Sequence, residues 1–227
     1  MAFNIGFVLF PNVTQLDLTG PLQVLHRLPE ARAHIAAKSL TPVATDCGLS
    51  LVPTTTFAAC EPLDLLCVPG GFGVSGAIAD PDTIDFVRRQ AARAKYVTSV
   101  CTGAFVLGVA GLLRGRRATT HWAYTDLLPL VGAVHAQARV VRDGNIFTGA
   151  GVTAGIDFAL SVAAEVAGSE AAERIQLSLE YDPAPPFKAG NPRLATASVR
   201  ERVSERFAAR LATFRGELEQ AMAPLPT

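Results

Sequence analysis

Residues 96–105, Tyr-Val-Thr-Ser-Val-Cys-Thr-Gly-Ala-Phe, decide how the chain is expected to fold. Tyr96–Val100 is an uncharged run rich in β-branched residues, of the kind that forms a buried strand, and Thr102–Leu113 has the composition of a buried helix. Cys101 therefore stands at a sharp strand-to-helix junction. Such a junction presents its side chain at the carboxyl edge of the sheet, where ligands bind in α/β folds.

Strands and helices alternate on both sides of this stretch. Phe3–Phe10 ends at Pro11, and Asp64–Val68 leads into the glycine loop Pro69–Gly73; apart from Asn4 and Asp64 both runs are apolar, as strands buried on two faces are. We therefore predict an α/β fold with a mostly parallel sheet and helices on both faces. Helices are expected at 19–28, 80–94, 102–113, 121–130, 153–167 and 169–181, short strands at 34–38, 41–45, 49–53 and 118–120, and a hairpin at 139–148.

Composition excludes several classes of protein. The chain has 227 residues with 20 Lys+Arg and 20 Asp+Glu, so it carries no overall basic charge for nucleic acid, and 49% hydrophobic residues exclude intrinsic disorder. The uncharged stretch 96–113 changes from strand-like to helix-like and is not expected to span a membrane. We predict no metal site, because the four cysteines form no C-x-x-C pair. The N-terminus does not resemble a signal peptide, so a cytoplasmic location is expected.

We find no internal repeat and no second domain, and we predict one domain over residues 1–227. An irregular run, 182–192, precedes an amphipathic helix at about 197–222. Its apolar stripe, which includes Phe207 and Phe214, is expected to pack on the body or on a second subunit.

Cys101 is the candidate nucleophile. The N-terminus of the following helix supplies unpaired N–H groups and partial positive charge, which predict a lowered pKa of the thiol and a reactive thiolate. Gly103 leaves room for close backbone approach. The alternative is that Cys101 is a small buried hydrophobic residue, as free cysteines often are.

Two other segments are expected at the same sheet edge. The N–H groups of Gly71 and Thr102 are candidates to hold a developing negative charge, although the glycine loop is also explained as a tight turn. Asp17 follows the first strand, and repulsion by a thiolate is expected to raise its pKa so that it can carry a proton. Without further context, a helix cap is the favoured interpretation of Asp17.

The segment Arg117-Ala-Thr-Thr-His-Trp122 contains a histidine at a third junction. His121 is a candidate base, but the favoured interpretation is a structural residue that caps a helix or packs beside Trp122. The glycine-rich stretch 149–157 only superficially resembles a dinucleotide loop, and we expect it to pack closely near Cys101.

Five of these motifs occur in the order in which they occur in the ThiJ/PfpI superfamily, which the chain resembles over residues 1 to about 190. They are QLDLTGP at 15–21, PGG at 69–71, VCTG at 100–103, ATTHW at 118–122 and GVTAGID at 151–157. The resemblance implies a flavodoxin-like sandwich with Cys101 on a nucleophile elbow, and a homodimer. Residues 91–103 and 179–187 are most similar to its isocyanide hydratase branch. Thr102 stands where the protease-like branch has histidine, and one helix after Pro192 is too little for the DNA-binding region of related regulators.

This resemblance implies an isocyanide substrate, hydrated to an N-substituted formamide without a cofactor. Cys101 would attack the isocyanide carbon and form a covalent thioimidate, and Asp17 would supply the proton and help to activate water. Thr102 would assist catalysis, and Gly70, Gly71 and Phe72 would bind the substrate or the developing charge.

Three alternatives remain open from the sequence. Cys101 is also the residue expected in a glyoxalase or deglycase of the same superfamily, which would act on methylglyoxal. It is equally the residue expected in an oxidative-stress sensor, which would respond to peroxide without turning over isocyanides. A ligand-binding remnant of a regulator is disfavoured, because no DNA-binding region follows.

Overall fold

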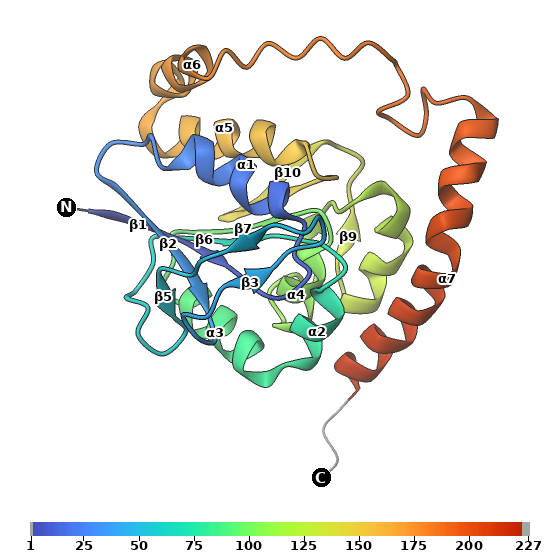
Figure 1. Ribbon diagram of the computed structural model, residues 1–227, viewed down its shortest axis with the longest axis horizontal. Coiled ribbons are helices and arrows are strands. Elements are labelled where there is room, and N and C mark those ends of the chain that lie inside the picture. The colour runs from blue at the N-terminus through green and yellow to red at the C-terminus, as the bar shows by residue number, and fades with distance from the viewer. Residues whose placement is uncertain (1, 224–227) are drawn as a thin grey trace.

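The computed structural model describes residues 2–223 and shows a central sheet with helices on both sides (Figure 1). The strands are β1 (Phe3–Val8), β2 (Ala31–Ala37), β3 (Val43–Ala44), β4 (Ser50–Leu51), β5 (Thr55–Thr56), β6 (Leu65–Val68), β7 (Tyr96–Val100), β8 (Arg117–Ala118), β9 (Val134–His135), β10 (Val140–Asp143) and β11 (Ile146–Gly149). The helices are α1 (Gln15–Leu25), α2 (Val74–Ala79), α3 (Pro81–Ala91), α4 (Gly103–Val109), the 3-10 helix η1 (Trp122–Val131), α5 (Ala154–Ala167), α6 (Ser169–Ser178) and α7 (Ala197–Met222).

Seven strands form the central sheet in the order β10-β11-β7-β6-β1-β2-β5. All neighbours are parallel except β10 and β11, which form the antiparallel hairpin predicted around Asp143, Gly144 and Asn145. The predicted α/β class with a mostly parallel sheet is confirmed. Because β1, β6 and β7 are adjacent and parallel, the segments that follow them meet at one edge of the sheet.

Helices α1, α5 and α6 cover one face of the sheet, and α2, α3 and α4 cover the other (Figure 1). Every side chain of β6 is buried, as is every side chain of β7 after Tyr96. Both faces of these strands are covered, so their sequences show no alternation of apolar and polar residues. The polar side chains of Thr98 and Ser99 in β7 are buried as well, and Thr98 Oγ1 donates a hydrogen bond of 2.8 Å to the carbonyl oxygen of Leu66.

The helix α1 begins earlier than the sequence predicts. It starts at Gln15 rather than Thr19, so Pro21 lies inside the helix and not near its start. Pro21 packs against α5, where a Cβ added at Gly155 would lie 3.1 Å from the proline ring. The free energy gained by packing against α5 therefore outweighs the cost of the backbone hydrogen bond that the proline cannot donate. Asp17 lies in the first turn of this helix, and not at its N-cap, which is Thr14.

The helix expected at 121–130 is present as Trp122–Val131, but it is a 3-10 helix with Pro129 inside it. The short helix α2 was not predicted, because its six residues carry no periodic pattern long enough to detect. It follows the glycine loop directly and packs against α4 and α7.

The last helix, α7, lies beside η1, α2 and α4 (Figure 1). Phe214 and Leu218 are its buried residues, and Phe214 packs edge-on against Phe105 of α4 at 5.1 Å between ring centroids. Residues 182–196, which we call the connector, join the end of the body to α7. Within residues 2–223, no helix combines the length and apolar character needed to span a bilayer.

Candidate active site

Cys101 occupies a strained turn between β7 and α4. Its φ of +56° is in the left-handed region, which non-glycine residues rarely adopt. Three hydrogen bonds hold the strained residue: its N–H donates to the carbonyl oxygens of Gly149 (3.1 Å) and Ala150 (2.8 Å), and its carbonyl accepts from Thr120 Oγ1 at 2.7 Å. This is the sharp strand-to-helix junction that the sequence predicts. The expected close packing of the glycine-rich stretch near Cys101 is also confirmed.

The elbow requires a glycine two residues after the cysteine. A Cβ added at Gly103 would lie 2.2 Å from the carbonyl oxygen of Val68, at the end of the neighbouring strand β6. Gly103 therefore lets the start of α4 approach the glycine loop closely.

Asp17 reaches the elbow from α1. Its side chain is fully buried, and Oδ2 accepts a hydrogen bond of 3.0 Å from the N–H of Gly70. Among the described residues, Oδ1 accepts no hydrogen bond from nitrogen or oxygen, and the Cys101 thiol interacts with this carboxyl. Burial raises the pKa of Asp17 to about 7, partly offset by the Gly70 N–H and by the thiol. The predicted direction is confirmed, but desolvation is the main cause, not repulsion by a thiolate.

The predicted low pKa of Cys101 is wrong in this structure. The side chain is only 6% exposed, and burial raises the pKa of the thiol well above its ordinary value of 9, as does the nearby Asp17 carboxylate. The backbone N–H and the hydroxyl of Thr102 act in the opposite direction but do not outweigh these effects. The helix N-terminus therefore favours the thiolate, as predicted, but burial opposes it more strongly. The thiol keeps its proton until a base accepts it.

Thr102 connects the elbow to the glycine loop. Its Oγ1 accepts a hydrogen bond of 3.0 Å from the N–H of Gly71 and donates one of 3.3 Å to the carbonyl oxygen of the same residue. The Gly71 N–H is thus bound to Thr102 and is not free for an anion, and the Gly70 N–H is bound to Asp17. A Cβ at Gly70 would lie 2.6 Å from Thr102 N and 2.8 Å from Asp17 Oδ2. The loop holds Asp17 and Thr102 in place.

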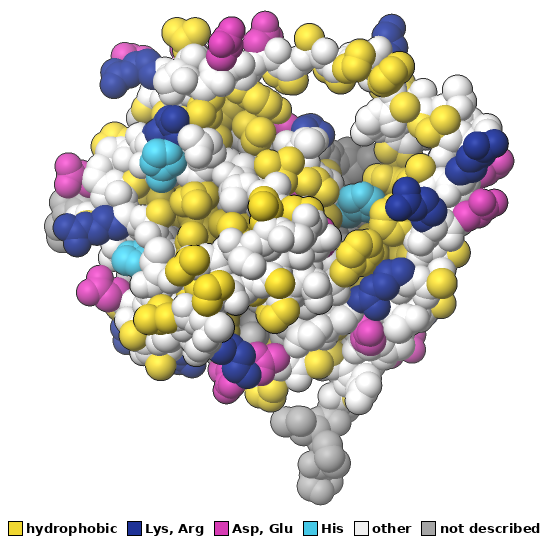
Figure 2. Space-filling view, viewed as in Figure 1, with side chains coloured by type: hydrophobic (Ala, Val, Ile, Leu, Met, Phe, Trp, Pro, Cys, Tyr) yellow, Lys and Arg dark blue, Asp and Glu magenta, His cyan; other side chains and the backbone are white. Residues whose placement is uncertain are grey.

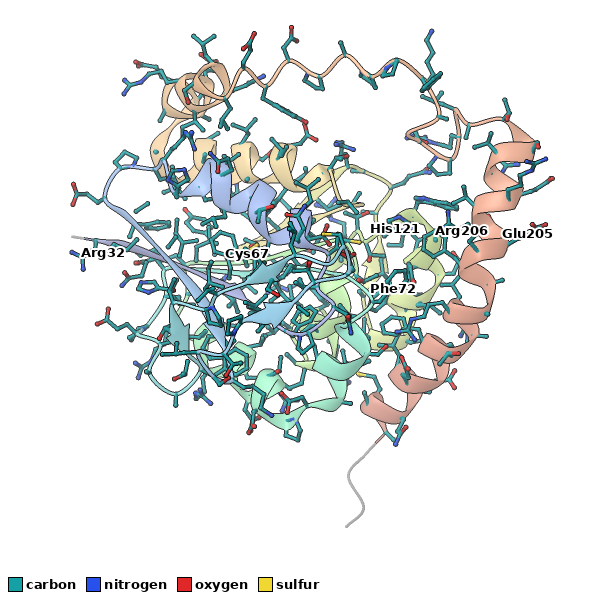
Figure 3. All side chains as sticks on the ribbon, in the orientation of Figure 1. Arg32, Cys67, Phe72, His121, Glu205 and Arg206 are labelled. Carbon is teal, nitrogen blue, oxygen red and sulfur yellow. The ribbon has the colours of Figure 1, made fainter. Side chains whose placement is uncertain are left out.

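Phe72 extends from the same loop and is 56% exposed. It lines a cavity of about 480 Å³ together with Phe10, Val43 and Ala77. Figure 3 shows Phe72 on the side of the body toward α2, and Cys67 within the sheet. The cavity at Phe72 shares no lining residue with the larger cavity described next.

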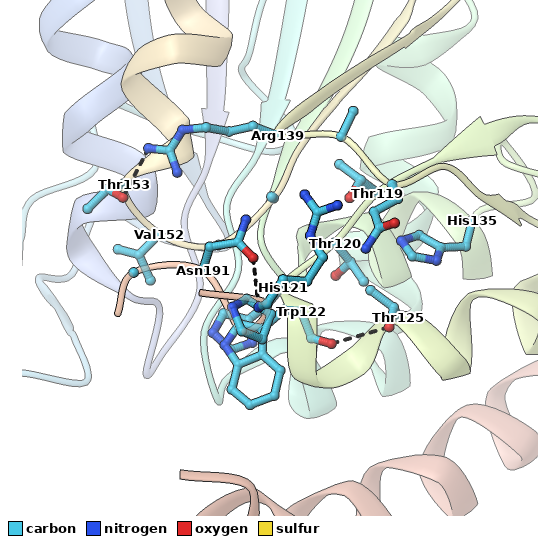
Figure 4. Close-up of a pocket in the computed structure, with 17 residues that line it drawn as sticks. Thr119, Thr120, His121, Trp122, Thr125, His135, Arg139, Val152, Thr153 and Asn191 are labelled. Carbon is cyan, nitrogen blue, oxygen red and sulfur yellow. Dashed lines mark hydrogen bonds between the residues drawn. The ribbon is translucent and has the colours of Figure 1, made fainter. Parts of the chain in front are cut away.

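The larger cavity, of about 500 Å³, lies next to the elbow (Figure 4). Cys101 itself does not line it, but Thr120 and Ala150, which hydrogen-bond to the Cys101 backbone, do. Trp122 and residues 190–193 of the connector line other parts. Figure 2 shows the corresponding hollow between the body and the connector.

His121 borders this cavity and faces α7 (Figure 3). Its Nδ1 accepts a hydrogen bond of 3.3 Å from the N–H of Ala123, so it caps η1, and its ring lies 5.7 Å from Trp122 and 5.3 Å from Phe207. Burial lowers the pKa of His121 to about 4, and the imidazole is neutral at pH 7. The capping and packing roles favoured from the sequence are confirmed.

Some residues around the site were not singled out from the sequence. Thr120 lies in the motif that contains the candidate base His121. Ala150 acts through its backbone carbonyl, which no pattern of side chains reveals. Residues 190–192 belong to the irregular run 182–192 and Arg193 follows it, and no motif there indicates a site. The hydrogen bonds of Thr120 and Ala150 become visible only once β7, β8 and β11 are placed in space.

Comparison with known proteins agrees with this geometry. The model of the DJ-1/PfpI family matches residues 4–165. The isonitrile hydratase of Pseudomonas putida is 56% identical over 225 residues, which cover 99% of each chain. A ThiJ/PfpI family protein from Pseudomonas syringae has a crystal structure that matches with a TM-score of 0.92 and 45% identity, over 97% of this chain and 90% of that one. The transcriptional regulator CdhR of Pseudomonas aeruginosa is 31% identical over 80% of this chain but only 55% of its own length. The elbow, the buried carboxyl and these matches together show that the chain belongs to the DJ-1/PfpI family.

Proposed function

We propose that this protein hydrates isocyanides to N-substituted formamides through a covalent adduct on Cys101. The observation that carries the proposal is the pairing of the Cys101 thiol with the buried Asp17 carboxyl at the elbow. The full-length similarity to an isonitrile hydratase, at 56% identity, supports the choice of substrate.

The first step needs a base and a proton donor in one place. Burial raises the pKa of the thiol well above its ordinary value of 9 and that of Asp17 to about 7, so above pH 7 an ionised Asp17 faces a protonated Cys101. Asp17 accepts the thiol proton as sulfur bonds to the terminal isocyanide carbon, and then passes the proton to that carbon. The product is a thioimidate, R–N=CH–S, on Cys101, and Asp17 is an anion again.

The second step uses the same carboxylate. Asp17 accepts a proton from water as the oxygen attacks the thioimidate carbon. Asp17 then passes this proton to the nitrogen, and the C=N double bond becomes a single bond. Collapse of the adduct breaks the C–S bond and releases R–NH–CHO, and the sulfur recovers its proton. Water is consumed, no electrons are exchanged, and the residues return to their starting state. We therefore propose that no cofactor takes part.

Thr102, Gly70 and Gly71 have positioning roles in this proposal. The Gly70 N–H orients Asp17, and the mutual hydrogen bonds of Thr102 and Gly71 fix the elbow against the loop. The Thr102 N–H favours negative charge on sulfur as the adduct forms and breaks. Phe72, on the same loop, is proposed to contact the substrate during entry.

We further propose that residues 1–227 form one domain that acts as a homodimer in the cytoplasm. Phe187 and Leu194 of the connector are 78% and 68% exposed, and Val199 of α7 is 45% exposed, which supports burial of this apolar surface by a second copy. The four cysteines are free thiols, as expected in a reducing compartment. Sedimentation velocity tests the dimer, and a single species of monomer mass would contradict it.

The test of the function is the conversion of phenyl isocyanide to the formamide. The reaction is monitored through the loss of the isocyanide infrared band. We expect turnover by the native protein, none by C101A, and full turnover by C47A, which removes an exposed thiol instead. Full activity of C101A would refute the proposal. Methylglyoxal serves as the competing substrate, and its turnover without isocyanide turnover would favour the glyoxalase alternative.

A further inference from the structure

The acidic and basic side chains that line the larger cavity are all of one sign. Arg139 and Arg193 both line it, and no aspartate or glutamate is among its described lining residues. Arg139 is already engaged, because its guanidinium binds Asp157 and also donates to Thr153 Oγ1 at 3.2 Å (Figure 4). Arg193 forms no ion pair within residues 2–223. A cation without a partner at the wall of a cavity is suited to an anionic ligand.

The position of Arg193 is set by the connector. The side-chain oxygen of Asn191 accepts a hydrogen bond of 2.9 Å from the Arg193 N–H, and both residues line the cavity. The half-buried ring of Trp122 lines the same space. An aromatic ring and a guanidinium on one cavity are the two groups that would hold a flat substituent ending in a carboxylate.

The cavity also borders the backbone of the residue that carries the reacting sulfur. Ala150 and Thr120 line it and bond directly to the N–H and the carbonyl of Cys101. A volume of about 500 Å³ is in the range of small-molecule pockets and exceeds what an isocyanide group alone requires.

We propose that this cavity binds the N-substituent of the isocyanide, and that Arg193 selects substituents that carry a carboxylate. The inference rests on the proposed hydration and names the substrate class of that site. An isocyanide with an aryl or short alkyl carboxylate would place its reactive carbon at Cys101 and its anionic end at the connector. His121 adds no charge at neutral pH, because burial lowers its pKa to about 4.

The first experiment compares isocyanides of equal size. We expect kcat/KM for 4-isocyanobenzoate to exceed that for 4-isocyanobenzamide by about tenfold, as a charge-assisted hydrogen bond partly open to solvent would give. R193Q should remove this preference and leave phenyl isocyanide turnover within about twofold, and R193K should keep part of it because the positive charge remains. K188Q changes another exposed cation of the connector that does not line the cavity, and should retain the full preference.

The second experiment measures binding without turnover. Trp122 is the only tryptophan of the chain, so its fluorescence reports occupancy of the cavity directly. Titration with benzoate and benzamide should give tighter binding of benzoate to the native protein and equal binding of both to R193Q.

The outcomes separate the two proposals. Two results would overturn the role of Arg193 without contradicting the proposed hydration. One is hydration of phenyl isocyanide with no preference for the carboxylate substrate, and the other is an equal decrease of kcat/KM for all substrates in R193Q. Failure to hydrate any isocyanide would overturn the proposed function and with it the substrate class. The fluorescence titration would then still decide whether Arg193 makes the cavity an anion site.

Discussion

The Asp17 carboxyl and the Cys101 thiol interact at the carboxyl edge of the sheet, and each alters the pKa of the other. The thiol lowers the pKa of Asp17, which burial holds near 7, and the carboxylate raises the pKa of the thiol. Above pH 7 the pair therefore holds one proton, on sulfur, with a base beside it. An addition that moves a proton from a nucleophile to an electrophilic carbon needs this state.

The pH dependence of the reaction should follow Asp17. Below pH 7 the carboxyl is protonated and cannot accept the thiol proton, so kcat/KM should fall as pH decreases through about 7. Initial rates of formamide formation between pH 5 and 8.5 measure this limb, and a flat profile from pH 6 to 8 would contradict it. D17N, which cannot act as a base, should lose about a hundredfold or more in kcat/KM.

The same carboxyl should destabilise the folded protein at high pH. The pKa of Asp17 rises from 3.8 to about 7 on folding, so the folded state holds this proton more tightly than the unfolded state. The stabilising contribution is complete below about pH 4, decreases as pH rises, and is lost above pH 7. D17N should therefore increase the free energy of unfolding at pH 8, by at most roughly 4 kcal/mol, and change it little at pH 4. Urea denaturation at the two pH values checks this, and equal effects at both would argue against it.

Gly70 should tolerate no side chain. G70A would place its Cβ 2.6 Å from Thr102 N and 2.8 Å from Asp17 Oδ2, so either the carboxyl or the elbow must move. We expect a loss of activity of at least about a hundredfold, because small displacements of reacting groups are costly. G76A is the matched control: a Cβ there meets nothing within 4 Å, and the exposed helical position should gain about 0.5–1 kcal/mol of stability with unchanged activity.

The hydroxyl of Thr102 should matter more than its methyl group. T102V removes the partner of the Gly71 N–H and should lower the free energy of unfolding by about 1–3 kcal/mol. It also removes a group that lowers the pKa of Cys101, so the thiol should react more slowly with iodoacetamide. T102S keeps the hydroxyl and should behave nearly as the native protein. Equal effects of the two substitutions would assign the role to packing.

The attachment of α7 should depend on one aromatic residue. Phe214 is 2% exposed and packs edge-on against Phe105 and Tyr124. F214A should lower the free energy of unfolding by about 3–5 kcal/mol. V199A, at a position 45% exposed on the same helix, should change it by less than about 1 kcal/mol. Thermal and urea denaturation compare the two variants, and similar effects would contradict the proposed packing of α7.

The sequence alone determined the fold class, the strand-to-helix turn at Cys101 and the extent of the last helix. These follow from local patterns: apolar runs that suit a strand buried on both faces, a glycine where α4 meets the neighbouring strand, and the apolar stripe of α7. Local patterns extend over one or two turns of helix, and they do not show which neighbours surround a side chain. Local patterns therefore do not predict the early start of α1, which is stabilised by packing of Pro21 on α5.

Only the tertiary structure decided the ionisation of the site and the lining of its cavity. The helix N-terminus at Cys101 is visible in the sequence and favours a thiolate, but the desolvation that outweighs it depends on how many segments cover the sulfur. That Arg193 and Trp122 line one cavity depends in the same way on the path of the connector from α6 to α7. Charge and burial act through space, and chain positions far apart in sequence meet only when the sheet and its covering helices have formed.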